Sequence, residues 1–289
     1  MSEVQTQAGW RIPVITDAEF ERLRGLIRAQ AGIHLRDHKR QLLVGRLAQR
    51  LRALGLDSFS AYYERVSEDS TGEELRTLIN LITTNKTSFF REPHHFEFLR
   101  SRLIPEARQR GQTELRIWSA GCSTGEEPYT IAMTVAEALG QFHGWKVRIL
   151  ASDIDTEVLA RARAGTYPLD ALEDVSAERR QAHFLRGYGR FEGMAQVRPE
   201  LQKTVEFRRI NLSVPDWGLV ERFDAIFCRN VIIYFDLPTQ QRIVERLAER
   251  LKPEGYFFSG HSENLSWLRP RLAPVGTTVY RWKQGAESP

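Results

Sequence analysis

The chain has 289 residues, of which 42% are hydrophobic, 27% are charged and 10% are aromatic, and its formal net charge at pH 7 is +4. This composition supplies enough apolar material for a sizeable core and excludes wholesale disorder, and the length fits about two domains. There is no run of ~18 uncharged apolar residues, and the polar segment Met1–Pro13 lacks an apolar signal core, so we expect a cytoplasmic protein without membrane insertion. Two cysteines, Cys122 and Cys228, are too few for a disulfide framework and fit a reducing compartment.

Basic residues are concentrated near the N-terminus. The stretch Phe20–Arg52 contains nine basic and two acidic residues, a net charge of +7, and is called the basic patch below. From the residues alone, two interpretations are equally good: a solvated helix face, or a docking surface for an anionic partner. The nine basic residues are Arg22, Arg24, Arg28, Arg36, Lys39, Arg40, Arg46, Arg50 and Arg52.

Residues 17–80 are predicted to form short helices. Asp17 is suited to cap the first, and leucines at helical spacing indicate a second that ends at Gly55. Further helices are expected from Asp57 or Ser58 and after Gly72. Because no strand pattern occurs in this region, it is predicted to be a small all-α domain.

After about residue 113, short β-rich runs alternate with helical stretches, which indicates βαβ units and a mostly parallel sheet. Residues 168–204 interrupt the alternation with a polar, glycine-containing segment, which we expect to form a small antiparallel insertion. Strands are predicted at 114–119, 146–152, 205–211, 223–228, 256–259 and 277–282, and helices at 126–139, 156–164, 239–251 and 262–269.

The turn after the first of these strands has the composition of a nucleotide site. Gly121 and Gly125 let the backbone approach a ligand, and a helix N-terminus follows. The turn lacks the lysine of a P-loop, and Glu126 and Glu127 would repel a pyrophosphate. A ligand with net positive character, such as S-adenosylmethionine, suits it better. Asp153, at the end of the next strand, is suited to accept ribose hydroxyls.

Five motifs in the same order give a specific resemblance. The chain resembles the bacterial chemotaxis receptor methyltransferases of the CheR type, which methylate glutamate side chains of chemoreceptors. The resemblance runs from about residue 20 to the last predicted strand. The motifs are Thr83–Glu92 (TTNKTSFFRE), Ser119–Tyr129 (SAGCSTGEEPY), Ala151–Asp155 (ASDID), Phe227–Phe235 (FCRNVIIYF) and Gly260–Asn264 (GHSEN).

The resemblance implies an α/β fold of the class I Rossmann-like methyltransferase type, with a mostly parallel seven-stranded sheet. It places an N-terminal helical receptor-docking domain and linker at residues 1–85. The S-adenosylmethionine-dependent methyltransferase domain follows at 86–289, with an inserted β-subdomain at about 168–204. By the resemblance, Arg91 and Tyr234 lie close to the transferring methyl group. The cofactor is held by positions matching Asn85, Thr87, Arg91, Glu127, Asp153, Asn211, Leu212, Arg229 and Asn230.

The implied reaction converts receptor glutamates into methyl esters for adaptation in chemotaxis and leaves S-adenosylhomocysteine. A glutamate carboxylate, with an ordinary pKa of ~4.3, is already ionised at neutral pH and needs no general base. The leaving group is a neutral thioether, so positioning and exclusion of water remain as the enzyme's tasks. We expect no metal, because the adjacent His94 and His95 should point to different faces of a helix.

Several partner assignments follow from the resemblance and the charge pattern. The acidic methylation helices of chemoreceptors are expected to dock on the basic patch through Arg46, Arg50 and Arg52, and a receptor C-terminal tail is a second candidate partner, at Gly187–Gly193. A monomer is the default expectation, with no nucleic-acid partner. Two alternatives stay open: a methyltransferase acting on RNA or on another protein, and a non-catalytic module that binds the cofactor or receptors.

Overall fold

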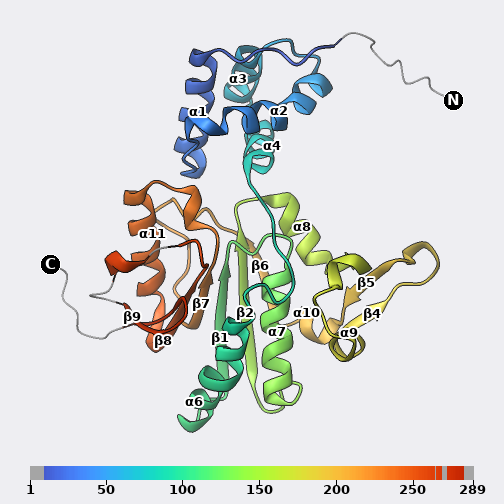
Figure 1. Ribbon diagram of the computed structural model, residues 1–289, viewed down its shortest axis with the longest axis vertical. Helices are drawn as coiled ribbons and strands as arrows, with labels where there is room; N and C mark the ends of the chain where they lie inside the picture. Colours follow the sequence, from blue (N-terminus) through green and yellow to red (C-terminus); the bar gives the residue numbers. More distant parts are fainter. Residues whose placement is uncertain (1–9, 264, 269–271, 283–289) are drawn as a thin grey trace. The chain divides into compact units, whose positions relative to one another are not determined.

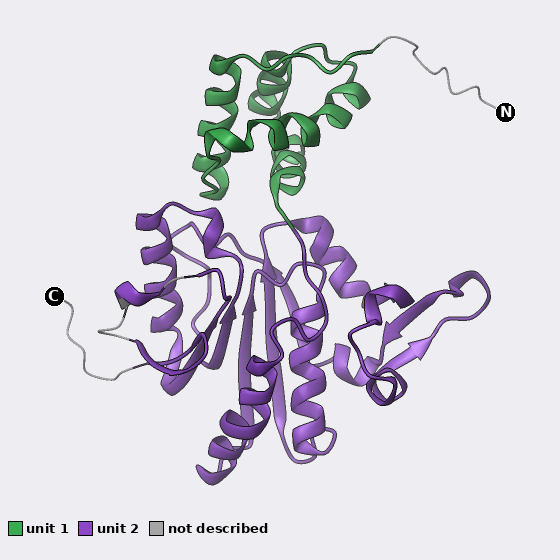
Figure 2. Ribbon diagram, viewed as in Figure 1, with its two compact units in different colours: residues 1–84 green, residues 85–289 purple. Residues whose placement is uncertain are grey.

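A computed structural model describes residues 10–263, 265–268 and 272–282. The chain divides into two compact units, Met1–Thr84 and Asn85–Pro289 (Figure 2). None of the described helices is both long enough and apolar enough to cross a membrane.

Among its described residues, the first unit contains helices and the loops between them, and no strand. Thr16 begins the first helix with a capping box, in which its hydroxyl accepts from the backbone of Glu19 and the Glu19 carboxylate accepts from the backbone of Thr16. Gly32 and Gly55 take the left-handed conformation and end the first and second helices. The helices are α1 (Asp17–Ala31), α2 (Arg40–Leu54), α3 (Phe59–Glu68) and α4 (Glu73–Ile82), with a 3-10 turn at Asp37–Lys39.

Two arginines of the basic patch are used inside this unit. Arg50 pairs with the buried carboxylate of Glu74, which also accepts a hydrogen bond from the Tyr62 hydroxyl at 3.0 Å. The hydrogen bond from Arg50 is the leading cause that lowers the pKa of Glu74. Arg46 donates to the carbonyls of Leu81, Ile82 and Thr83 at the end of α4. Both side chains therefore hold α2 against α4.

The second unit contains a seven-stranded sheet with the order β6-β2-β1-β7-β8-β10-β9 (Figure 1). All its neighbours pair in parallel except β10, which is antiparallel to β8 and to β9. The predicted mostly parallel, seven-stranded α/β fold is therefore confirmed. The strands are β1 (Glu114–Ala120), β2 (Lys146–Asp153), β6 (Val205–Arg209), β7 (Phe223–Cys228), β8 (Leu251–Ser259), β9 (Leu272–Gly276) and β10 (Val279–Trp282).

Strand alternation divides the apolar residues of the sheet between two cores. Leu115 and Ile117 join the core beneath α7 (Glu126–Leu139), and Trp118 joins the core beneath α11 (Leu237–Glu249). The first core also contains residues from α5 (His94–Phe98), a π-helical turn (Leu99–Leu103) and α6 (Ile104–Gln109). At the β6 edge, α8 (Thr156–Ala164) contacts β2 and β6.

A separate three-stranded antiparallel sheet, in the order β3-β5-β4, confirms the predicted insertion. Figure 1 shows β4, β5 and α9 on the opposite side of this unit from α11 and β8. Phe89 packs edge-on against Tyr167 and Phe184 and so anchors the insertion on the segment before Arg91. The elements are β3 (Thr166–Pro168), β4 (Phe184–Arg186), β5 (Met194–Val197), α9 (Ala177–His183) and α10 (Pro199–Gln202), with 3-10 turns at Leu169–Leu172 and Gly189–Phe191.

Some predicted boundaries were wrong for local reasons. The helix expected at 239–251 spans 237–249, because Asp236 caps it and a proline occupies its first turn. Strand β6 ends at Arg209 rather than 211. Of the helix expected at 262–269, the described residues show only a 3-10 turn, Ser266–Leu268, while residues 264 and 269 lie outside the description.

Candidate functional site

The candidate site lies at the carboxyl ends of β1, β2 and β7, which are neighbours in the sheet. The turn after β1 is close-packed. Gly121 has φ +85°, and a Cβ there would lie 2.2 Å from a methyl of Val231, in the loop after β7. Gly125 has φ +99°, and a Cβ there would lie 2.9 Å from Cβ of Ala162. Glycine is therefore required at both positions by backbone conformation and by space.

Asp153, at the end of β2, faces this turn. Its carboxylate accepts the backbone N–H of Ser123 at 2.9 Å and that of Asp155 at 3.0 Å. Burial raises the pKa of the Asp153 carboxyl, and no described cationic side chain forms an ion pair with it. Asp155 caps α8 and accepts a hydrogen bond from the Asn85 side chain at 2.8 Å. Asn85 and Asp153 are thus connected through Asp155.

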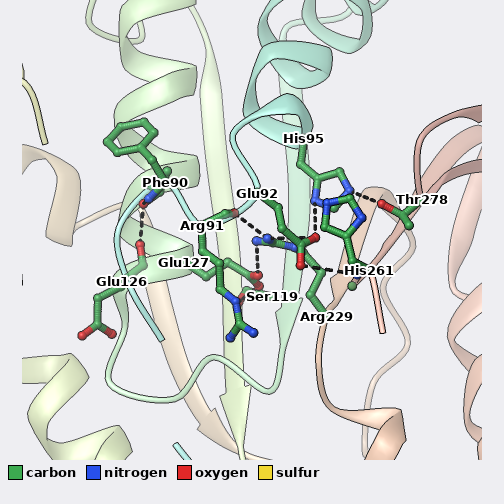
Figure 3. Close-up of polar contacts among 12 residues, drawn as sticks. Phe90, Arg91, Glu92, His95, Ser119, Glu126, Glu127, Arg229, His261 and Thr278 are labelled. Carbon is green, nitrogen blue, oxygen red and sulfur yellow. Dashed lines mark hydrogen bonds and ion pairs between the residues drawn. The ribbon is translucent and has the colours of Figure 1, made fainter. Parts of the chain in front are cut away.

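Arg229, directly after β7, is buried between two carboxylates (Figure 3). Its guanidinium lies 2.9 Å from an oxygen of Glu127 and 3.3 Å from an oxygen of Glu92, and it also donates to the carbonyl of Arg91. Ser119 donates to the second Glu127 oxygen at 2.7 Å. Burial raises the pKa of Glu127 and the charge of Arg229 opposes that shift. The network joins the ends of β1 and β7, the first turn of α7 and the segment before α5.

The segment that carries Arg91 is held in an unusual conformation. Phe90 and Glu92 have φ +54° and +57°, which few non-glycine residues adopt. The Phe90 N–H donates to Thr130 of α7 at 3.2 Å, and the Arg91 guanidinium donates to the carbonyl of Lys86 at 2.9 Å. No described acidic side chain forms an ion pair with Arg91, whereas Arg229 has two such partners.

His94 and His95 do not point to different faces, so that expectation was wrong. Their ring centroids lie 4.1 Å apart, and both rings contact the hydroxyl of Thr278 in the turn before β10. The shared contact with Thr278 places both rings on one side, with the His95 ring buried and the His94 ring against His261.

Ligand atoms of Glu92, His94 and His95 lie within 4.8 Å of one another, a spacing that suits a metal ion. The Glu92 oxygen that lies 3.6 Å from the His95 ring also lies 3.3 Å from the Arg229 guanidinium, whose charge would repel a metal cation. Burial is also the first cause that lowers the pKa of His95, to about 2, and the Arg229 charge adds to it. We interpret the two histidines as neutral packing and hydrogen-bonding groups beside the Glu92–Arg229 pair.

The remaining predicted residues occupy separate places around this edge. Asn230 has φ +59°, and Tyr234 ends a 3-10 turn that begins at Ile232. Asn211 accepts the N–H of Ser213, so its side chain stabilises the turn after β6. Leu212 is buried and Thr87 is half-buried. The docking candidates Arg46, Arg50 and Arg52 belong to the other unit, where Arg52 is exposed.

Sequence reasoning assigned no part in the site to Glu92 or Glu263. Glu92 binds Arg229, and Glu263 accepts backbone N–H groups of the loop after β7. Both residues lie within the motifs quoted above. An acid inside such a motif is a signal that could have suggested a buried carboxylate at each position. Asn264, the last residue of the fifth motif, lies outside the described residues.

Family models match nearly the whole chain. The CheR methyltransferase SAM-binding domain matches residues 85–281, and the CheR methyltransferase all-alpha domain matches residues 18–83. The chain belongs to the CheR methyltransferase family. The resemblance expected from the motifs is thereby confirmed.

Three relatives show how far the CheR likeness extends. The chain is 49% identical to the chemotaxis protein methyltransferase of Salmonella typhimurium, over 92% of this chain and 90% of the relative. It is 48% identical to that of Escherichia coli, over 92% and 91% of the two chains. It is also 48% identical to chemotaxis protein methyltransferase 2 of Pseudomonas aeruginosa, over 92% and 93%.

As a CheR methyltransferase, the protein uses S-adenosylmethionine, and its residues fit that molecule. The cofactor carries ribose hydroxyls and a net positive methionine end. Asp153 offers a half-buried carboxylate without a described cationic partner, and Glu126 adds an acid without a described ion pair in the first turn of α7. Both features favour a ligand of this charge over a pyrophosphate.

The half-buried Asp153 carboxylate predicts a pH-dependent affinity for S-adenosylhomocysteine. Because burial raises the pKa of Asp153, this carboxylate takes up a proton at a higher pH than an ordinary aspartate does. The affinity for S-adenosylhomocysteine is therefore expected to fall as the pH decreases through that higher range. Asp153→Asn should bind ~10-fold or more weakly at neutral pH, since a hydrogen bond to a charged group is lost. Isothermal titration calorimetry between pH 5 and 8 measures both effects.

The matched control is Asp224→Asn, which removes a buried carboxylate at the start of β7, at the opposite end of that strand from the site. It should bind S-adenosylhomocysteine within about threefold of the wild type, because Asp224 accepts from Gln112, the Arg116 N–H and Lys252, which are not residues of the site. Equal affinities of Asp153→Asn and the wild type would reject the ribose role of Asp153.

Proposed function

We propose that this enzyme transfers the methyl group of S-adenosylmethionine to glutamate carboxylates of chemoreceptors and forms glutamate methyl esters. The observation that carries the proposal is the contrast between two arginines. Arg229 is neutralised by Glu127 and Glu92, whereas Arg91 has no described acidic partner. An arginine without a carboxylate partner beside the cofactor site is suited to receive the carboxylate of a substrate.

The proposed chemistry needs positioning rather than proton transfer. The cofactor supplies a methyl group bound to a positively charged sulfur. A glutamate oxygen is already ionised at neutral pH, and Arg91 would hold the carboxylate by hydrogen bonds that leave one lone pair free. Tyr234 would donate one hydrogen bond and wall the path of the methyl group. Together the two residues would align oxygen and carbon and exclude water.

The relatives support the choice of partner. They are named chemotaxis protein methyltransferases, and they match this chain over about nine-tenths of both lengths. We infer that the methylation helices of chemoreceptors are the substrates and that the reaction takes place in the cytoplasm. All residues of the proposed catalytic site come from one unit of one chain, so the proposal requires only a monomer.

A labelling experiment tests the proposed function. Purified enzyme is incubated with methyl-labelled S-adenosylmethionine and receptor-containing membranes. An alkali-labile label on receptor protein is expected, because carboxyl methyl esters hydrolyse in base. An alkali-stable label would indicate N-methylation, label in added RNA would indicate a nucleic-acid substrate, and no label would favour a non-catalytic module.

Variants of Arg91 and Tyr234 test the roles of these residues. Arg91→Ala and Tyr234→Phe are each expected to lower the rate of ester formation at least ~10-fold, because they disturb alignment in the transition state. Their affinity for S-adenosylhomocysteine should change much less. Wild-type turnover in both variants would remove the catalytic assignment.

Docking of the methylation helices on the basic patch needs a probe that leaves the helical unit folded. Arg46 and Arg50 are poor probes because they hold α2 against α4. The exposed Arg52 has no partner among the described residues. Arg52→Glu is expected to slow methylation at low salt by a factor of ~3 or more, and the effect should shrink in ~0.5 M salt as charges are screened.

The control is Arg148→Glu, which makes the same charge change at an exposed position of β2 in the other unit. Equal methylation rates for the two variants at low salt would reject the docking role and favour the interpretation of the basic patch as a solvated helix face.

A receptor C-terminal tail is proposed to dock at the loop Gly187–Gly193. This loop exposes Tyr188 by 79% and Phe191 by 51%, and it adjoins β4, an edge strand of the inserted sheet. Exposed aromatic side chains beside a free strand edge are a common way to bind an extended peptide.

Tail peptides titrated against the wild type should bind, and Gly189→Val should weaken that binding. Gly189 has φ +58°, so a β-branched residue there strains the loop. The control is Gly218→Val, at φ +63° in a segment remote from the insertion in sequence. Absence of wild-type binding would end the proposal.

A further inference from the structure

The turn after β8 contains a buried acid that the proposed chemistry does not use. The carboxylate of Glu263, only 4% exposed, accepts three backbone N–H groups. One oxygen accepts from Val231 at 2.8 Å and Ile232 at 3.0 Å, and the other accepts from Gly260 at 2.7 Å. Hydrogen bonds from backbone N–H groups to an ionised acceptor are roughly twice as strong as those between neutral groups.

The loop that Glu263 binds lies between two glycines. A Cβ at Gly260 would lie 2.5 Å from the side-chain nitrogen of Asn230 and 2.8 Å from its backbone nitrogen. On the other side, a Cβ at Gly121 would meet Val231. The loop is therefore held by close packing at two points and by a carboxylate at a third.

The same turn also contacts the segment that carries Arg91. The backbone N–H of His261 donates to an oxygen of Glu92 at 3.3 Å (Figure 3). The His261 ring also lies against His94. The four residues Gly260–Glu263 thus touch both segments that bear the proposed catalytic residues, on either side of the buried Arg229.

We propose that Glu263 is a positioning residue for methyl transfer. Its carboxylate fixes the loop from Arg229 to Tyr234 in the geometry that cofactor binding and catalysis require. The proposal rests on the cofactor assignments of Arg229 and Asn230 and on the catalytic role of Tyr234.

A general role in stability alone accounts poorly for the arrangement. Burial raises the pKa of Glu263 and the backbone N–H groups oppose that shift, so the fold bears a desolvation cost at this position. An apolar residue would avoid this cost, but it would leave the N–H groups of Val231 and Ile232 without their acceptor. Asn230 in this loop has a positive φ, a backbone conformation that costs free energy and persists only where surrounding contacts stabilise it. The Glu263 carboxylate supplies such contacts to the neighbouring N–H groups.

The test is Glu263→Gln, which preserves size but turns an amide –NH2 toward backbone donors. The affinity for S-adenosylhomocysteine is expected to fall ~10-fold and the rate of methylation ~10-fold or more, because displacing aligned groups by about 1 Å has effects of this order or larger. Calorimetry measures the first effect, and the separation of kcat from KM measures the second.

Asp224→Asn is the matched control. Asp224 is a buried acid at the other end of β7, and it accepts from the Arg116 N–H at 2.8 Å and from Lys252 at 2.7 Å. Its variant should lower the melting temperature at least as much as Glu263→Gln yet bind S-adenosylhomocysteine like the wild type. Equal losses of affinity in both variants, or wild-type affinity and kcat in Glu263→Gln, would overturn the proposal.

Gly260→Ala reaches the same loop by another route, since its Cβ would displace Asn230. The double variant with Glu263→Gln is expected to lose less affinity than the two single variants combined, because both release one loop. Full additivity would contradict a shared loop. These affinities are measured without any receptor, so they stand or fall separately from the proposed glutamate substrate.

Discussion

The geometry of the site depends on one buried cation. The Arg229 guanidinium joins Glu127 on α7 to Glu92 on the segment before α5, and it also binds the backbone of Arg91. Three parts of the chain that are far apart in sequence are fixed by one side chain. A buried pair of this kind adds little net stability, but removal of either member leaves an uncompensated charge in the interior. The contacts of Arg229, together with the bond from the Phe90 N–H to Thr130, hold the segment Phe90–Glu92 in its unusual conformation.

This arrangement also sets the charge that a substrate meets. Arg229 pairs with Glu127 and Glu92, whereas Asp153 at the end of β2 forms no ion pair with a described cationic side chain. In the proposed function, Arg91 receives the carboxylate of the substrate. The proposed reaction brings together a positively charged methyl donor and a negatively charged acceptor, and each needs a partner of opposite charge. Because Glu127 and Glu92 pair with Arg229, Arg91 keeps its charge for the acceptor. The absence of a general base in the proposed chemistry is consistent with an acceptor that is already ionised.

Local signals predicted the sheet and its principal helices well, whereas tertiary contacts were harder to foresee. The bounds of α7 and α8 match the prediction because Gly125, Gly140, Asp155 and Gly165 mark their ends within the sequence itself. The cluster of His94 with His95 was missed because Thr278, about 180 positions away, sets the orientation of both rings. The inward turn of Glu263 was missed for a similar reason, since the groups that it binds lie in a loop after another strand.

The basic patch illustrates the difference between counting charges and locating them. The charge of Arg50 is cancelled by Glu74, which lies outside the patch in sequence. Arg46 instead binds carbonyls at the end of α4, whose partial negative charges offset only part of its charge. Arg46 therefore still contributes to the long-range field, although its guanidinium is committed to the fold. In the proposed docking of an acidic helix, both kinds of arginine would contribute to long-range attraction, and direct contact would come from exposed arginines such as Arg52.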